Sequence, residues 1–117
     1  AAGEGGPKDV VKAREVLDRA CEKKQVTACL FLAELWEKGE GGVIPDEIMA
    51  ARYYKRVCDS NGKEGCRRYA DLLASGKAGE ADGEKAAKYY YWRACSLGDK
   101  ASCQKPSSKK VEKEKKR

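Results

Sequence analysis

The sequence predicts an all-α fold in which helix-turn-helix repeats stack into a right-handed superhelical solenoid. Two series of cysteines, Cys21→Cys58→Cys95 and Cys29→Cys66→Cys103, each step by 37 residues. Within each 37-residue unit the apolar residues follow helical spacing. One two-helix unit cannot bury its own apolar face, so neighbouring units must stack.

The 37-residue period divides the chain into five segments. These are a remnant of a preceding inter-repeat loop (1–8), repeat 1 (9–45), repeat 2 (46–81), a partial repeat 3 (82–103) and a basic tail (104–117). In repeat 1, Asp9 is the expected N-cap of the first helix, because a carboxylate can accept the free amide protons of a first turn. The apolar residues expected on its two helices are Val10, Ala13, Leu17 and Ala20, then Leu30, Ala33 and Leu35.

Repeat 2 follows the same plan. Asp46 is the expected N-cap of its first helix, and Asn61-Gly62 is a typical turn. The second helix is expected from about Glu64. Gly76 then occupies the position of a left-handed C-cap. The residues expected on the buried stripes are Ile48, Ala50, Ala51, Tyr54, Val57 and Cys58, then Cys66, Tyr69, Ala70, Leu72 and Leu73.

Repeat 3 differs by a run of four aromatic residues, Tyr89-Tyr90-Tyr91-Trp92. In the 37-residue register Trp92 aligns with Asp18 and Lys55, and Tyr89 aligns with Glu15 and Arg52. Because the aligned residues are charged, this face is expected to meet solvent. The spacing of Asp82 also fits a 36-residue register with one inserted residue, such as a π-bulge, before Cys95. The rings either cover the end of the array or anchor a peptide or protein partner.

The cysteines are best explained as three local disulfides. Residues eight apart on one helix lie about 12 Å apart, whereas a disulfide needs about 4.4–6.8 Å between α-carbons. The chain must therefore turn between the cysteines of each pair, at Gln25-Val26-Thr27, Asn61-Gly62 and Gly98-Asp99. The expected pairs are Cys21–Cys29, Cys58–Cys66 and Cys95–Cys103.

Two other interpretations of the cysteines remain, a zinc site and buried free thiols. The chain has no His and its pairs are far apart for one four-ligand site, so no metal is expected. Free cysteine is common in helical cores. Disulfides predict an oxidising compartment: the periplasm or the cell exterior, with the mitochondrial intermembrane space as the alternative.

Several stretches resemble the Sel1-like repeat in its cysteine-rich form, as found in the cysteine-rich proteins of Helicobacter. They are residues 46–58 (DEIMAARYYKRVC), 65–66, 70–76 (ADLLASG), 82–90 (DGEKAAKYY), 93–98 (RACSLG) and 32–43. The resemblance implies an all-α solenoid similar to tetratricopeptide arrays, with one disulfide per repeat. Residues 104–108 do not supply the second helix of repeat 3, and residues 3–8 resemble a loop that closes an earlier repeat. The chain is therefore expected to be the C-terminal piece of a longer array.

The net charge of +6 lies mostly in the tail, where six Lys and one Arg against two Glu give +5. The tail is expected to be disordered, with contact to an anionic surface as the functional alternative. The near-neutral body offers no basic groove, so no nucleic-acid partner is expected. No apolar run approaches the roughly 20 residues of a membrane helix.

These features predict a non-catalytic adaptor or assembly scaffold that binds a protein or peptide on the face formed by the first helices. The expected binding residues are Tyr89, Trp92, Arg52 and Lys55, and no cofactor is expected. The alternative is a weak penicillin-binding or β-lactamase-like protein, a property that the family resemblance brings with it. Ser60, Ser102 and Ser107 each begin a Ser-x-x-Lys match, but the Ser-Asp-Asn and Lys-Thr-Gly elements of serine β-lactamases are missing.

Overall fold

A computed structural model describes residues 7–39 and 44–105, with side chains from residue 12 onward. Every regular element in these ranges is a helix. The helices are α1 (Pro7–Glu22), α2 (Val26–Lys38), α3 (Glu47–Asp59), α4 (Lys63–Ala74), α5 (Gly83–Ser96) and α6 (Lys100–Cys103). The expected loop remnant before residue 7 and the tail from residue 106 lie outside the described residues.

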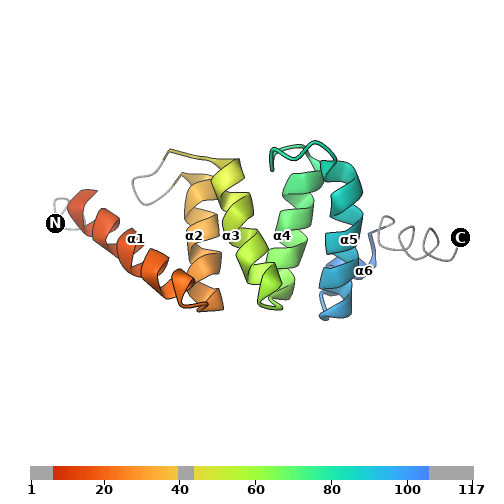
Figure 1. Ribbon diagram of the computed structural model, residues 1–117, viewed down its shortest axis with the longest axis horizontal. Coiled ribbons are helices and arrows are strands. Elements are labelled where there is room, and N and C mark those ends of the chain that lie inside the picture. The colour runs from red at the N-terminus through yellow and green to blue at the C-terminus, as the bar shows by residue number, and fades with distance from the viewer. Residues whose placement is uncertain (1–6, 40–43, 106–117) are drawn as a thin grey trace, which may run out of the picture.

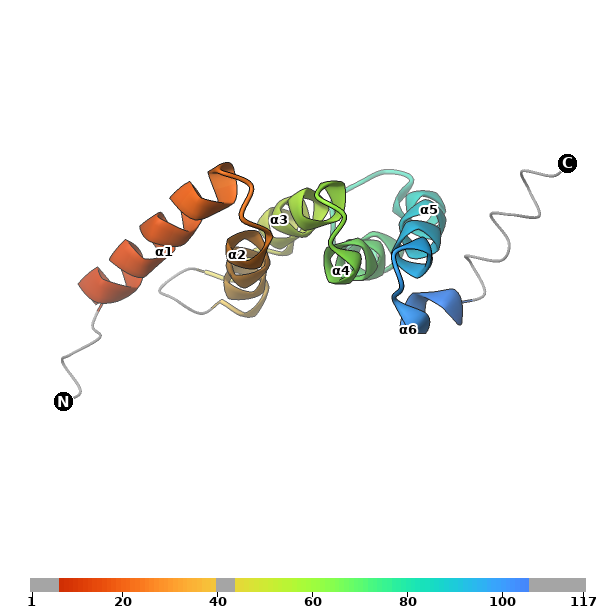
Figure 2. The same ribbon diagram turned by 90° about the horizontal axis from the view of Figure 1, so that it is seen from below.

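The helices stand in a row in chain order (Figure 1). Seen from below, α1, α3 and α5 form one layer, and α2, α4 and α6 form the other (Figure 2). Each helix packs mainly on the helices before and after it, so α3 lies between α2 and α4. The predicted all-α solenoid is therefore confirmed. The second helix of repeat 3, α6, has only four residues.

Small residues fill the places where helices cross. Six alanines from α2 to α5 are at most 2% exposed: Ala33, Ala50, Ala51, Ala70, Ala87 and Ala94. Larger side chains such as Leu32, Tyr54 and Leu73 are equally buried and fill the space between the layers. The expected buried stripes are wrong at Ile48 and Ala13, both of which are exposed.

The two expected first-helix caps differ in outcome. Asp46 caps α3 as predicted, because its Oδ1 accepts hydrogen bonds from the backbone N–H of Ile48 (3.0 Å) and Met49 (3.2 Å). Asp9 is not a cap, because α1 begins two residues earlier, at Pro7. Proline suits a first helical position since its missing N–H would have no partner there. Pro7 and Lys8 thus belong to the helix and not to the preceding loop.

The turns between paired helices also keep the 37-residue period. Lys24, Asn61 and Gly98 all have positive φ, at 66°, 66° and 103°. The turns expected at Asn61-Gly62 and Gly98-Asp99 are confirmed. The turn expected at Gln25-Val26-Thr27 is wrong, because α2 already begins at Val26. The turn lies earlier, around Lys24, which takes the left-handed conformation. Lysine lacks the turn preference of Asn or Gly, so the sequence did not mark this position.

The extra residue of repeat 3 lies at the start of α5. Its N-cap, Asp82, comes 36 residues after Asp46, while its buried Ala87 and Tyr91 keep the 37-residue distance from Ala50 and Tyr54. The helix is α-helical throughout. The π-bulge expected before Cys95 is therefore wrong: α5 gains its additional residue by starting earlier than α3 in the common register.

Candidate functional site

Two neighbouring hollows of about 380 and 210 Å³ lie between α3, α5 and the α4–α5 connection. They share Lys55, Tyr69 and Glu80, so they form one surface depression, here called the α3–α5 groove. Its other lining residues are Ile48, Ala51, Arg52, Leu73, Ala78, Gly79, Ala81, Asp82, Ala86 and Tyr90. The groove thus has an apolar and aromatic floor with charged residues from α3 and from the α4–α5 connection.

Aromatic rings continue from the groove around α5. The Tyr69 and Tyr90 rings meet edge to face at 4.7 Å, and Tyr90 meets Tyr89 in the same way at 4.9 Å. Tyr89 lies 5.9 Å from Trp92. Tyr89 is 42% exposed and Trp92 is half-buried. Aromatic rings in such rows provide large, rigid contact areas for a partner.

The structure brings two of the four sequence-predicted binding residues into the groove. Arg52 and Lys55 line it, whereas Tyr89 and Trp92 adjoin it through the ring contacts of Tyr90. Sequence reasoning did not place Tyr69 or Glu80 at this groove, and it named Tyr90 only as part of the aromatic run. Tyr69 is 7% exposed, as expected for the buried stripe, and it aligns with the fully buried Leu32, so nothing in the register marked it as a groove-lining residue.

Tyrosine hydroxyls tie each repeat to the repeat before it. Tyr53 donates to Asp18 at 2.8 Å, Tyr54 donates to Glu37 at 2.6 Å, and Tyr91 donates to Asp71. Burial, and then the hydrogen bond to Asp18, raise the pKa of Tyr53 to about 12. Burial is also the largest cause of the raised pKa of Tyr54 and of Tyr91, and the hydrogen bonds to Glu37 and Asp71 raise it further. These hydroxyls therefore stay neutral donors that join repeats.

The groove tyrosine Tyr69 behaves similarly. Burial, and then the proximity of Tyr90 and Glu80, raise its pKa to about 12. A neutral phenol in a groove supports hydrogen bonding and ring packing, and it offers no general base near neutral pH.

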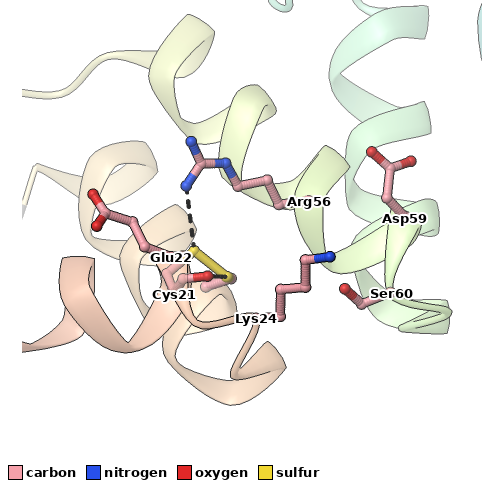
Figure 3. Close-up of a pocket in the computed structure, with 7 residues that line it drawn as sticks. Cys21, Glu22, Lys24, Arg56, Asp59 and Ser60 are labelled. Carbon is pink, nitrogen blue, oxygen red and sulfur yellow. Dashed lines mark hydrogen bonds between the residues drawn. A yellow bond between two sulfur atoms is a disulfide. The ribbon is translucent and has the colours of Figure 1, made fainter.

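A third hollow, of about 380 Å³, lies beside the Cys21–Cys29 disulfide (Figure 3). Arg56 reaches from α3 to the Sγ of Cys21, at 3.7 Å. Ser60, the first residue of a Ser-x-x-Lys match, also lines this hollow. Within the described residues its hydroxyl makes no hydrogen bond to a basic side chain, so the pairing of nucleophile and base that acyl transfer needs is not formed there.

Of the two other Ser-x-x-Lys serines, Ser102 offers no catalytic arrangement among the described residues. Ser102 is fully buried, and its hydroxyl donates to the Asp99 carboxylate at 2.6 Å. The same carboxylate caps α6 by accepting from the Ser102 backbone N–H at 3.1 Å. Ser107 lies outside the described residues. The Lys105 ammonium lies 5.2 Å from the centre of the Tyr91 ring. Ser102 therefore has a structural role.

Each repeat contains one disulfide: Cys21–Cys29, Cys58–Cys66 and Cys95–Cys103. Their α-carbons are 4.7, 4.5 and 4.6 Å apart, within the range that a disulfide accepts. All six cysteines are paired. In the described ranges no cluster of His, Cys, Asp or Glu could hold a metal ion. No helix in the same ranges is long and apolar enough to cross a membrane.

A row of two-helix repeats, each closed by its own disulfide, defines a cysteine-rich helical repeat protein. The solved structure of Helicobacter pylori cysteine-rich protein B, a Sel1-like repeat protein, has the same fold, with a TM-score of 0.71. It is 33% identical in sequence, and the alignment covers 79% of this chain and 68% of that one. The chain therefore belongs to the cysteine-rich Sel1-like repeat family. No protein-family model and no curated protein sequence matched the chain.

Proposed function

We propose that this chain is a non-catalytic adaptor or assembly scaffold that binds a segment of a partner protein in the α3–α5 groove. The repeat fold is one of protein-interaction scaffolds. The observation that carries the proposal is the groove itself, with Tyr69 and Tyr90 on its floor and Arg52 and Lys55 on the α3 side. Tyr89 and Trp92 continue this aromatic surface toward the end of the array.

The lining of the groove selects the chemistry of the bound segment. Its alanines and tyrosine rings favour an apolar side chain, and Arg52 and Lys55 favour an acidic residue next to it. Lys55 forms an exposed ion pair with Asp59 at 3.3 Å, which contributes little stability and can be exchanged for a partner carboxylate. An extended peptide with an apolar anchor and an adjacent carboxylate fits both features.

Selection from a displayed random-peptide library on the immobilised protein tests this proposal. Selected peptides should carry an apolar and acidic pair, and Arg52→Glu/Lys55→Glu should weaken their binding at least tenfold. Both side chains are exposed, so the fold should be kept. Lys12→Glu on α1 is the matched control and should not change the affinity. Peptides that bind the double variant as well as the parent would contradict the groove assignment.

The adaptor proposal includes the absence of catalysis. Steady-state hydrolysis of nitrocefin tests the β-lactamase-like alternative directly. No turnover above the uncatalysed rate is expected, because no basic side chain of residues 12–39 and 44–105 bonds to the Ser60 hydroxyl and because Ser102 is buried. Turnover that disappears on Ser60→Ala would overturn the adaptor proposal in favour of the enzyme.

Three disulfides and a cysteine-rich relative fit a protein outside the reducing cytosol. We place the chain in the periplasm or the cell exterior, with the mitochondrial intermembrane space as the alternative. A partner in one of these compartments would itself be exposed to oxidising conditions.

A further inference from the structure

The hollow of about 380 Å³ beside the first disulfide lies where the turn between α1 and α2 meets the C-terminal end of α3 (Figure 3). It lies inside the array, because both repeats that form it are present with both of their helices. A cavity of this size can hold a small molecule. Its lining residues, which include both cysteines of the disulfide, are Cys21, Glu22, Lys24, Cys29, Arg56, Asp59 and Ser60.

A leucine covers the corresponding disulfide of repeat 2. Leu97 of repeat 3 packs on the cluster of Cys58 and Cys66, both of which are fully buried. The residue 37 positions before Leu97 is Ser60, an exposed serine. Repeat 2 therefore does not provide the disulfide of repeat 1 with the cover that repeat 3 provides for the disulfide of repeat 2.

The charged residues at these two junctions also differ. Arg93 of α5 pairs with Asp59 at 3.8 Å and donates to the Oδ1 of Asn61 at 3.3 Å. Arg56 occupies the same register position on α3, but Lys24 stands where repeat 2 has Asn61. A second cation cannot accept a hydrogen bond from the first, so the Arg56 guanidinium lies instead 3.7 Å from a disulfide sulfur.

The lining of the hollow attracts negative charge. Lys24 and Arg56 form no ion pair with a carboxylate of residues 12–39 and 44–105. Of the two carboxylates in the lining, Asp59 is already paired with two basic side chains, at 3.3 and 3.8 Å. An anion that enters the hollow is therefore attracted by two cations and opposed mainly by Glu22.

We propose that this hollow binds a small thiol with a carboxylate or sulfonate group, and that the thiol exchanges with the Cys21–Cys29 disulfide. The thiolate of the small molecule attacks the Sγ of Cys29, the bond between the two cysteines breaks, and its electron pair leaves on Cys21. The product is a mixed disulfide at Cys29 and a thiolate at Cys21, so the incoming thiol is the whole reductant.

Two features of the hollow favour this exchange. The Arg56 guanidinium, 3.7 Å from the Cys21 Sγ, stabilises the leaving thiolate, and a stabilised thiolate leaves faster. The acidic group of the small thiol is held near Lys24. The exchange goes beyond the proposed adaptor function, because no residue that lines this hollow also lines the α3–α5 groove.

Two thiols of equal chain length and opposite charge test the proposal on the native protein: 2-mercaptoethanesulfonate and cysteamine. Both are used at the same thiolate concentration, and excess N-ethylmaleimide stops the reaction and caps the released thiol. Peptide mass spectrometry then gives the rate at each disulfide and the position of the adduct. At Cys21–Cys29 the sulfonate should react at least about tenfold faster than cysteamine, with the adduct on Cys29. At Cys95–Cys103 the ratio of the two rates should be several times smaller.

Variants taken from the other junction identify the residues responsible. Lys24→Asn, which introduces the residue of repeat 2, and Arg56→Gln should each lower the ratio at least about threefold. Ser60→Leu, which introduces the residue of repeat 3, should slow the exchange with both thiols. All three side chains are exposed, so the helical circular dichroism should be kept. Lys23→Asn is the control: it removes the same charge one residue away from the hollow lining and should not change the ratio.

The rates of the native chain alone decide the proposal, even if a variant does not fold. Equal rates with the two thiols, no exchange at Cys21–Cys29, an adduct on Cys21, or an equal ratio at Cys95–Cys103 would each overturn it. So would a Lys23→Asn variant that lowers the ratio as much as Lys24→Asn, because the preference would then come from the charge of the whole surface.

Discussion

Val57 of α3 and Gly65 of α4 share one space where the two helices of repeat 2 cross. A Cβ added at Gly65 would overlap the Val57 side chain and would lie 2.7 Å from the Tyr54 carbonyl oxygen. The other repeats divide this space differently. Their residue pairs in the same register are Ala20 with Ala28 and Ala94 with Ser102. In repeat 2 the first helix contributes the larger side chain, and the second helix contributes none.

This exchange predicts a strong coupling between the two positions. Gly65→Ala should destabilise the fold by about 1–3 kcal/mol, since overpacking a tight crossing displaces a helix. Val57→Ala should cost about 2 kcal/mol through the lost buried methyl groups. The double variant recreates the alanine pair found in repeat 1. Its loss of unfolding free energy should therefore be smaller than the sum of the two single losses by about 1 kcal/mol or more. Urea denaturation followed by circular dichroism measures all three, and additive losses would contradict the shared-space argument.

Individual residues were predictable where the register repeats a chemical type. Ala50 and Tyr54 are buried as the 37-residue period indicates, whereas Ala13, in the same register as Ala50, is exposed. The left-handed conformation of Lys24 was not predictable in this way. The turn itself requires it, and at the equivalent positions the other repeats have Asn61 and Gly98, which adopt it readily. A residue with no preference of its own takes the backbone conformation that the position demands.

Helices were predicted well in number and in order, and less well at their ends. The cysteine period places one turn within each pair of helices, and this alone requires two helices per repeat. The start of α1 was misplaced because Asp9 and Asp46 look equivalent in the register, while Pro7 starts the helix earlier. For α5 the 36-residue spacing of Asp82 was noted, but the extra residue was placed before Cys95 and not at the start of the helix, where it lies. An N-cap is a short-range feature, and the register alone does not decide which of several polar residues provides it.

Asp46 and Asp82 provide a matched test of this point. Both immediately precede a first helix, but only Asp46 accepts hydrogen bonds from the first turn of its helix. Asp46→Ala should therefore destabilise the protein by about 1 kcal/mol, as the loss of a helix cap usually does. Asp82→Ala should change the free energy of unfolding by less than about 0.5 kcal/mol, as for most surface substitutions. Chemical denaturation of both variants measures the two changes in unfolding free energy. Equal losses of stability would show that Asp82 caps α5 in solution.

At the scale of the whole molecule, the stacking of repeats decides which residues come together in the α3–α5 groove. The exposure of Arg52 and Lys55 could be predicted because they are charged positions of a first helix in the common register, while their role in binding stays a prediction. That Tyr69 and Glu80 line the same groove could not be predicted, because they come from α4 and from the connection that follows it. That connection passes over the junction between repeats, with the Ile48 side chain close to Gly79. A single-repeat pattern contains no information on which part of one repeat covers the next.

The order in which the disulfides open is a property of the whole array. Cys58 and Cys66 of the central repeat are fully buried, Cys21 and Cys29 are 3% exposed, and Cys95 and Cys103 at the C-terminal end are half-buried. Thiol attack requires access to a sulfur atom, so the bridges should open from the most accessible to the least.

With limiting dithiothreitol under native conditions, Cys95–Cys103 should be reduced first, Cys21–Cys29 second and Cys58–Cys66 last. Alkylation of the free thiols at successive times, followed by peptide mass spectrometry, gives the order. The last step should coincide with the loss of helical circular dichroism, because attack on the central bridge requires the stacked helices on both sides to separate. In a denaturant that unfolds the chain, the three rates should become similar, which shows that packing sets the difference. Early reduction of Cys58–Cys66 under native conditions would mean that the central repeat opens on its own, and it would contradict the protection of this bridge by the helices on both sides.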